Sequence, residues 1–288
     1  MKVFIFSDLH IDYQGNFDHL LSFKAADYHD AALLVAGDVS DNLGKLEQLL
    51  THFKRCFAEV AFVPGNHELW LRKTPYKDSV DKFNAIIALC QRLGVRTTPF
   101  KWAVNSTHPV WIVPLFSWYT KADEGIDSLY QPKPGDDQTE FIWSDNALCR
   151  WDQLGDTRPV DYFLKLNDAH LQQQYDAPVI SFSHFLPLTE LVFRPGWVKP
   201  KNFVDPMPYF NFTRVAGTTL LHQQIQQLGS QIHVYGHQHR NRHTHIDSTT
   251  YISHCLGYPK ERNRNSWRGN DKPKLIWHHG EIPLDQPY

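Results

Sequence analysis

The chain has few cysteines, no long apolar run and almost no net charge, and each absence excludes a class of protein. Its 288 residues include four cysteines without C-x-x-C spacing, which favours reduced thiols in a cytoplasmic protein, although disulfides are not excluded. No apolar run reaches membrane-spanning length, and the N-terminal "MKVFIFSDLH" turns polar too soon for a signal peptide. A formal charge of -2 argues against extended nucleic acid as a partner. We therefore expect a cytoplasmic protein that contacts no membrane.

Short apolar runs alternate with helical patterns along the chain. The runs that predict buried strands lie at 2–6, 31–36, 59–63, 109–116, 178–182 and 231–235. Helical periodicity appears at 43–57, at 79–94 and at 160–174. The alternation over the first hundred residues predicts parallel strands joined by helices, and alternating patterns at 243–254 and 274–279 predict antiparallel strands near the end of the chain.

The middle of the chain is less regular. It is rich in Trp, Asp, Gly and Pro, and we interpret residues 116–176 as an insertion in a single domain that spans residues 1–288. The tryptophans predict that the insertion is ordered and lies over one face of the domain. Trp118, Trp143 and Trp151 are expected either to fill the core or to stack against an aromatic group of a ligand.

Polar side chains follow five of the predicted strands. They belong to the segments Ser7-Asp8-Leu9-His10, Gly37-Asp38-Val39-Ser40-Asp41, Pro64-Gly65-Asn66-His67-Glu68, Ser183-His184 and Gly236-His237-Gln238-His239. Because the carboxyl ends of parallel strands meet at one edge of a sheet, these side chains are expected to form one cluster. Carboxylate, amide and imidazole groups together suit divalent ions of intermediate hardness. The donors are too many for one four-coordinate ion, which predicts two metals bridged by Asp38.

The motifs D-x-H, G-D-x-x-D, G-N-H-E, H and G-H-x-H, in this order from residue 8 to residue 239, resemble those of the calcineurin-like metallophosphoesterase superfamily. The resemblance covers most of the chain, but neither the insertion nor the residues beyond about 256. It implies an α/β fold, a four-layer αββα sandwich of two mixed β-sheets flanked by helices. It also places a dinuclear metal site at the carboxyl ends of the strands.

The resemblance also assigns roles to individual residues. It implies a first metal held by Asp8, His10, Asp38 and His239, and a second held by Asp38, Asn66, His184 and His237. His67 would face the substrate as a catalytic residue, and the Asp41 carboxylate would orient its imidazole and raise its pKa. The metals are two divalent ions drawn from Mn, Fe, Zn, Ni and Mg, and the sequence does not choose among them.

The activity implied by the resemblance is hydrolysis of phosphate esters by direct attack of a metal-bound hydroxide. Protein phosphatases of the superfamily carry an arginine after G-D-x-x-D and usually another before G-N-H-E. Here these positions are Asn42 and Pro64, which favours a phosphodiesterase or a small-substrate phosphatase. The expected partner is a small phosphate ester, with nucleotides among the candidates. The alternatives are a nuclease and a non-catalytic protein-binding scaffold.

Several polar residues beside the motifs have a simpler interpretation. Glu68 is expected beneath the site or on the surface, and His233 inside a sheet. His243 and His245 are expected to take no part in the site. The residues Arg240 and Arg242 and the basic segment 259–274 could bind an anionic substrate or form a solvated loop, and the sequence leaves both alternatives open.

Overall fold

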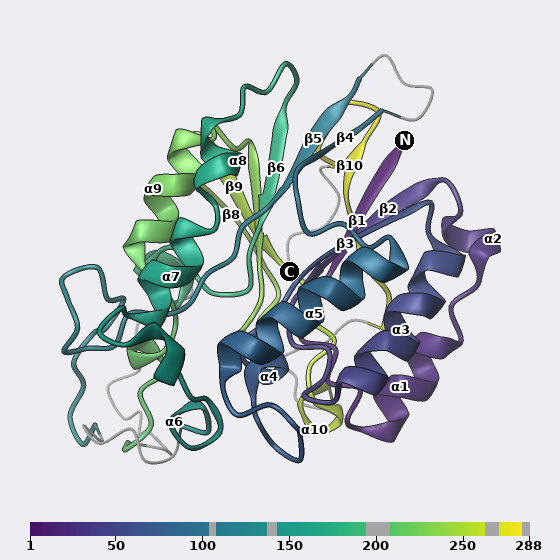
Figure 1. Cartoon of the computed structure of the whole chain (residues 1–288). Coiled ribbons are helices and arrows are strands. Elements are labelled where there is room, and N and C mark those ends of the chain that lie inside the picture. Colours follow the sequence, from purple (N-terminus) through teal and green to yellow (C-terminus); the bar gives the residue numbers. More distant parts are fainter. Residues whose placement is uncertain (104–107, 137–142, 194–207, 263–270, 284–288) are drawn as a thin grey trace.

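The structure of the chain is a computed structural model that describes residues 1–103, 108–136, 143–193, 208–262 and 271–283. Two β-sheets face each other at the centre, with helices on both outer sides (Figure 1). This arrangement confirms the expected α/β sandwich of two mixed sheets flanked by helices. In the described part of the chain, no helix is both long and apolar enough to cross a membrane.

The first sheet has the strand order β10-β1-β2-β3. Its strands are β1 (Lys2–Phe6), β2 (Ala31–Ala36), β3 (Glu59–Val63) and β10 (Lys274–His278). The first three run parallel, and β10 is antiparallel to β1. Phe6 pairs with Val35, and Ala36 pairs with Val63, so these strands end at nearly the same level. The segments that follow them therefore leave the sheet side by side.

The second sheet has the strand order β4-β5-β6-β7-β9-β8. Its strands are β4 (Phe100–Trp102), β5 (Val110–Pro114), β6 (Val179–Phe182), β7 (Ile232–Tyr235), β8 (Arg242–Ile246) and β9 (Thr249–Ser253). The strands β5, β6, β7 and β9 are parallel, whereas β4 and β8 are antiparallel edge strands. The antiparallel strands predicted near the end of the chain therefore form. Strands β8 and β9 pair as a hairpin, and β10 pairs with β1.

Helices of the first half of the chain cover the first sheet, and later helices cover the second (Figure 1). The first group is α1 (Gln14–Leu21), α2 (Ala25–Tyr28), α3 (Leu43–Cys56), α4 (Asn66–Leu69) and α5 (Ser79–Leu93). The second group is α7 (Pro159–Lys165), α8 (Asp168–Gln172) and α9 (Thr219–Gln227). The short α6 (Asp145–Leu148) contacts α4 through Asp145 and Asn66, and the short α10 (Pro259–Arg262) precedes β10. Short 3₁₀ turns lie at Asp152–Leu154, Thr189–Leu191 and Phe212–Arg214.

The predicted helices form, with one difference. Helix α5 ends just before Gly94, whose φ of +68° is the left-handed conformation that glycine adopts readily. The helix predicted over 160–174 is instead divided into α7 and α8. The break lies at Asn167, whose side chain accepts from the backbone N–H of Phe116 and donates to its carbonyl at 2.9 and 2.8 Å. The Asn167 side chain thus bonds both backbone groups of Phe116, just after β5, at the point where the helix is interrupted.

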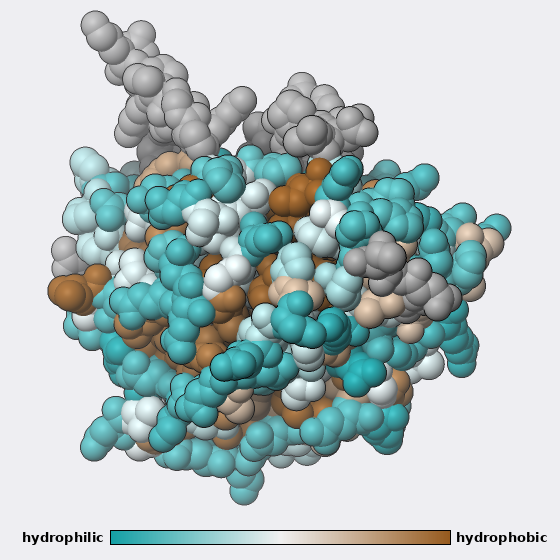
Figure 2. Space-filling view, turned by 90° about the horizontal axis from the view of Figure 1, so that it is seen from above, coloured by the Kyte–Doolittle hydropathy of each residue, from teal (hydrophilic) through white to brown (hydrophobic). Residues whose placement is uncertain are grey.

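Trp118 of the insertion fills the core, whereas Trp143 and Trp151 are only partly buried against it. Trp118 is 3% exposed and its ring contacts those of Trp151 and Phe185 with centroids 5.0 Å apart. It is therefore not available to stack against a ligand. On the face shown in Figure 2, hydrophobic residues are interspersed with hydrophilic ones. The four cysteines carry free thiols, and three of them are buried.

Candidate metal centre

The seven predicted metal ligands come together at the carboxyl ends of strands from both sheets. These side chains form two groups, and within each group all donor atoms lie within 4.8 Å of one another. One group is Asp8, His10, Asp38 and His239, and the other is Asp38, His184 and His237. Asn66 adjoins the second group, because its Oδ1 lies 3.2 Å from His184 Nε2. The two groups share Asp38, the residue that the sequence predicts as a bridge.

The backbone at these positions is unusual. Among the described residues, eight other than glycine have a positive φ, and five of them are predicted ligands. These five are Asp8 (51°), His10 (43°), Asp38 (57°), His237 (73°) and His239 (51°). Left-handed backbone is unfavourable for such residues and tends to gather at functional sites. The strained turns direct several polar side chains into one small volume.

Three of the four predicted histidine ligands have one ring nitrogen fixed by an acceptor. His184 Nδ1 lies 2.8 Å from the Ala36 carbonyl, and His237 Nε2 lies 2.9 Å from the Val215 carbonyl. His239 Nδ1 lies 2.8 Å from the carboxylate of Glu261. A neutral imidazole that donates from one nitrogen presents a lone pair on the other, which is the arrangement found around protein-bound metals.

The other ring nitrogens of His184 and His239 face polar atoms of neighbouring predicted ligands. His184 Nε2 lies 3.4 Å from Asp38 Oδ1 and 3.2 Å from Asn66 Oδ1. Likewise, His239 Nε2 is 2.9 Å from the Nε2 of His10. Such short distances between these groups require positive charge between them, from a proton on an imidazole nitrogen or from a cation. A divalent cation supplies that charge, so the donor set fits two metal ions.

The electrostatics of the cluster favour positive charge at the same place. Burial opposes the charged form of His184, but the neighbouring Asp38 carboxylate outweighs it and raises the pKa of His184 to about 9. Burial also opposes ionisation of Asp38, and the surrounding imidazoles nevertheless hold its pKa well below the usual range. Asp38 is therefore ionised at neutral pH, as a bridging ligand must be.

Glu68 fastens the two central loops to each other. Its buried carboxylate accepts backbone N–H groups of Asp38, Val39, Ser40 and Gly65 at 2.6 to 2.9 Å. A Cβ atom at Gly65 would lie 2.2 Å from Asp38 Oδ1, so only glycine allows this close approach. Glu68 thus lies beneath the site, and its alternative placement on the surface was wrong.

His67 lies at the accessible edge of the cluster. Its ring packs against Trp70 with centroids 3.7 Å apart, and its Nε2 is 3.7 Å from Asp38 Oδ2. The side chain is 14% exposed, more than that of Asp38 at 2%. Burial lowers the pKa of His67 to about 4, against the expected rise. The imidazole is therefore neutral at pH 7 and keeps one N–H to donate.

Asp41 does not contact His67. Its carboxylate lies 3.4 Å from Arg72 Nε, and its backbone carbonyl accepts from Lys82 Nζ at 2.7 Å. No hydrogen bond or ion pair joins Asp41 to His67 among the described residues, and the carboxylate nearest to that imidazole belongs to Asp38. The predicted orienting role of Asp41 therefore has no supporting contact in this structure.

The histidines expected to lie outside the site do so. His233 is buried in β7 and bonded to Ser181 and Ser183, whereas His243 and His245 are exposed on β8. The guanidinium groups of Arg240 and Arg242 both reach the Val192 carbonyl. Half of the basic segment 259–274, namely residues 263–270, lies outside the described residues.

Four residues that surround the ligands were missed by the sequence reasoning. They are Trp70, Asp145, Tyr258 and Glu261. Tyr258 covers the first group, with its ring centroid 4.4 Å from that of His10 and 4.7 Å from that of His239. Asp145 and Glu261 lie in the insertion and in the last part of the chain, where the family motifs give no signal. Trp70 could have been suspected, since it follows G-N-H-E by two residues.

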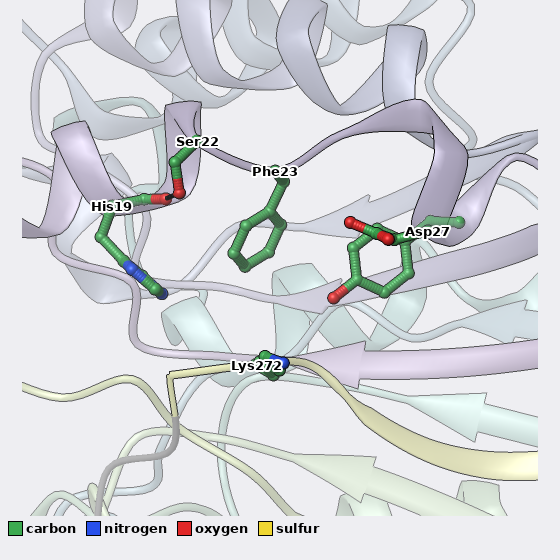
Figure 3. A pocket seen from close by; sticks show the side chains of 6 residues that line it. His19, Ser22, Phe23, Asp27 and Lys272 are labelled. Atoms are coloured by element: carbon green, nitrogen blue, oxygen red, sulfur yellow. Dashed lines mark hydrogen bonds between the residues drawn. The ribbon is translucent and has the colours of Figure 1, made fainter.

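A cavity of about 310 Å³ lies away from these residues (Figure 3). It is lined by His19, Ser22, Phe23, Asp27, Tyr28 and Lys272. Figure 3 shows His19, Phe23 and Asp27 on the side of α1 and α2, and Lys272 opposite them. None of the predicted ligands contributes to this cavity, so it is distinct from the candidate metal centre.

Comparison with known proteins gives three findings. The model of the calcineurin-like phosphoesterase family matches residues 1–241. The acyl-carrier-protein phosphodiesterase PptH of Mycobacterium tuberculosis is 28% identical over 276 residues, which cover 91% of this chain and 80% of that protein. The crystal structure of phosphopantetheinyl hydrolase (PptH) from the same organism superposes with a TM-score of 0.73 at 23% identity, covering 100% of this chain and 98% of the other.

Proposed function

The chain belongs to the calcineurin-like phosphoesterase family, and we propose that it is a two-metal phosphodiesterase that removes phosphopantetheine from an acyl carrier protein. The observation that carries the metal-dependent chemistry is the convergence of all seven predicted ligands, with His67 at the accessible edge of the cluster. The substrate class rests on the relative that matches nearly the whole chain.

In this proposal the side chains form two sites that share Asp38. The first comprises Asp8, His10, Asp38 and His239, and the second comprises Asp38, Asn66, His184 and His237. Divalent ions, when bound, supply the Lewis acidity that activates water and neutralises charge on a phosphoryl group. Glu261 and the carbonyls of Ala36 and Val215 keep the imidazoles of the sites in the tautomers that bind metal.

His67 acts on the substrate directly in this proposal. Its neutral ring keeps an N–H at one nitrogen, and Trp70 restricts the ring from one side. From the accessible edge of the cluster it donates that hydrogen bond to an oxygen of the phosphoryl group. Charge that develops on this oxygen during hydrolysis strengthens the bond, which lowers the barrier.

The proposed substrate replaces the expected small phosphate ester. Trp118, one of three tryptophans expected to stack against an aromatic group such as a nucleotide base, is buried in the core. Phosphopantetheine bound to a carrier protein presents a phosphodiester, which agrees with the residues at Asn42 and Pro64. In the reaction, water adds to phosphorus and the bond from phosphorus to the protein oxygen breaks. The products are unmodified carrier protein and phosphopantetheine.

The proposal predicts that the Mn²⁺-loaded protein converts a phosphopantetheinylated acyl carrier protein to its unmodified form. Intact-mass spectrometry of the carrier protein over time measures this conversion, with bis(p-nitrophenyl) phosphate and p-nitrophenyl phosphate assayed in parallel. Cleavage of the small diester without any change in the carrier protein would refute the substrate but keep the phosphodiesterase. If none of the three substrates is cleaved, the enzymatic function is refuted.

A further inference from the structure

One carboxylate of the insertion, that of Asp145, accepts hydrogen bonds from three side chains at the candidate metal centre. Asp145, the first residue of α6, is 3% exposed and accepts three side-chain N–H groups. The donors are Asn66 Nδ2 at 2.9 Å, Trp70 Nε1 at 2.6 Å and Trp143 Nε1 at 2.7 Å. Burying a carboxylate is costly unless donors satisfy it, and here three do so.

The bond from Asn66 fixes the orientation of its amide. A side-chain amide has one oxygen that can bind a metal and one nitrogen that cannot, and a half turn exchanges them. Because Asp145 can only accept, it holds the Nδ2 of Asn66 on its own side. The Oδ1 of Asn66 then faces the opposite way, 3.2 Å from His184 Nε2.

The other two donors also belong to residues that touch the centre. The Trp70 ring packs against the catalytic candidate His67, with centroids 3.7 Å apart. The ring of Trp143 meets that of His237 edge-on, with centroids 5.8 Å apart and an interplanar angle of 85°. The Asp145 carboxylate thus holds Trp143, which contacts the predicted ligand His237, and Trp70, which contacts His67.

We propose that Asp145 is a positioning residue, which presents the amide oxygen of Asn66 to the second metal and sets the orientation of Trp70 beneath His67. The insertion would then complete the metal centre in addition to covering the fold. This inference rests on the second-metal ligand set of the proposed function, but not on the identity of the substrate. Groups that orient metal ligands typically contribute about 10- to 100-fold to metal affinity.

The test compares Asp145→Ala and Asp145→Asn with wild-type protein, and it uses Asp156→Asn as a matched control. Asp156 is an exposed aspartate of the same insertion. Mn²⁺ is titrated into metal-free protein, and the two affinities are measured by calorimetry in the absence of substrate. We expect Asp145→Ala to weaken one of the two affinities by about 10- to 100-fold and to leave the other within about twofold. Asp145→Asn should weaken the same site by a smaller factor, because an amide offers one acceptor oxygen to three donors.

Other results would overturn the inference. Wild-type affinities at both sites in either variant would do so, and so would equal losses at both sites, which indicate a general structural effect. If Asp145→Ala does not fold, Asp145→Asn decides the question, and failure of both variants to fold even with Mn²⁺ would show a purely structural role. Failure of the wild-type protein to act on the carrier protein would refute the proposed substrate and leave these affinities unchanged.

Discussion

Asp38→Asn is expected to lower kcat for phosphodiester hydrolysis by at least about 1,000-fold. Asp38 is the one residue common to both donor groups, and its carboxylate lies 3.4 Å from His184 Nε2 and 3.7 Å from His67 Nε2. The amide keeps the size of the side chain but removes its negative charge. Loss of the shared carboxylate weakens both sites, and charge stabilisation worth several kcal/mol corresponds to this factor in rate.

The test of Asp38→Asn measures kcat and metal content on the same preparation. Asp156→Asn is the control, because it makes the same chemical change on an exposed residue. The variant should bind fewer than two metals per chain, whereas the control should match the wild type. An Asp38→Asn protein with full activity and full metal content would exclude the bridging role.

His67→Ala is expected to lower kcat by about 100- to 1,000-fold while both metals remain bound, since this is the range for loss of one hydrogen-bond donor to a developing charge. The imidazole lies beside the cluster and is not among its two groups of converging donor atoms. Its removal takes away a donor to the phosphoryl group and leaves the ligands in place. A loss of kcat without a loss of metal therefore distinguishes a residue that acts on the substrate from one that binds metal.

Steady-state kinetics on bis(p-nitrophenyl) phosphate and metal analysis together test this variant. His67→Gln is a useful companion, because its amide can still donate a hydrogen bond and should retain part of the lost rate. A His67→Ala protein that loses one metal would show that His67 is a ligand. Unchanged kcat would show that it takes no part in the reaction.

The strands and most of their polar ends were predictable from the sequence because both depend on local patterns. The runs at 2–6, 31–36 and 59–63 coincide with β1, β2 and β3, and their parallel pairing followed from the helices between them. The convergence of Asp8 and Asp38 then follows from strand register. Glycine at position 65 signals close approach in the sequence, although what approaches it is known only from the fold.

The surroundings of the ligands could not be predicted because they come from distant and irregular segments. Asp145 belongs to no recognisable sequence motif, and it bonds to Asn66, which lies 79 positions earlier in the chain. Glu261 reaches His239 from a segment in which the family motifs are absent. The Asp41 carboxylate, expected to orient His67, likewise contacts Arg72, which the sequence reasoning did not consider. Such contacts depend on tertiary packing, which a local pattern does not encode.

The most direct test of the dinuclear centre is the metal content of the purified protein after reconstitution with Mn²⁺ and removal of excess ion. Inductively coupled plasma mass spectrometry of the wild type should give two metals per chain. His184→Ala, which removes a donor that belongs to one group only, should give close to one. A wild-type protein that retains no metal, or a His184→Ala protein that retains two, would contradict the account.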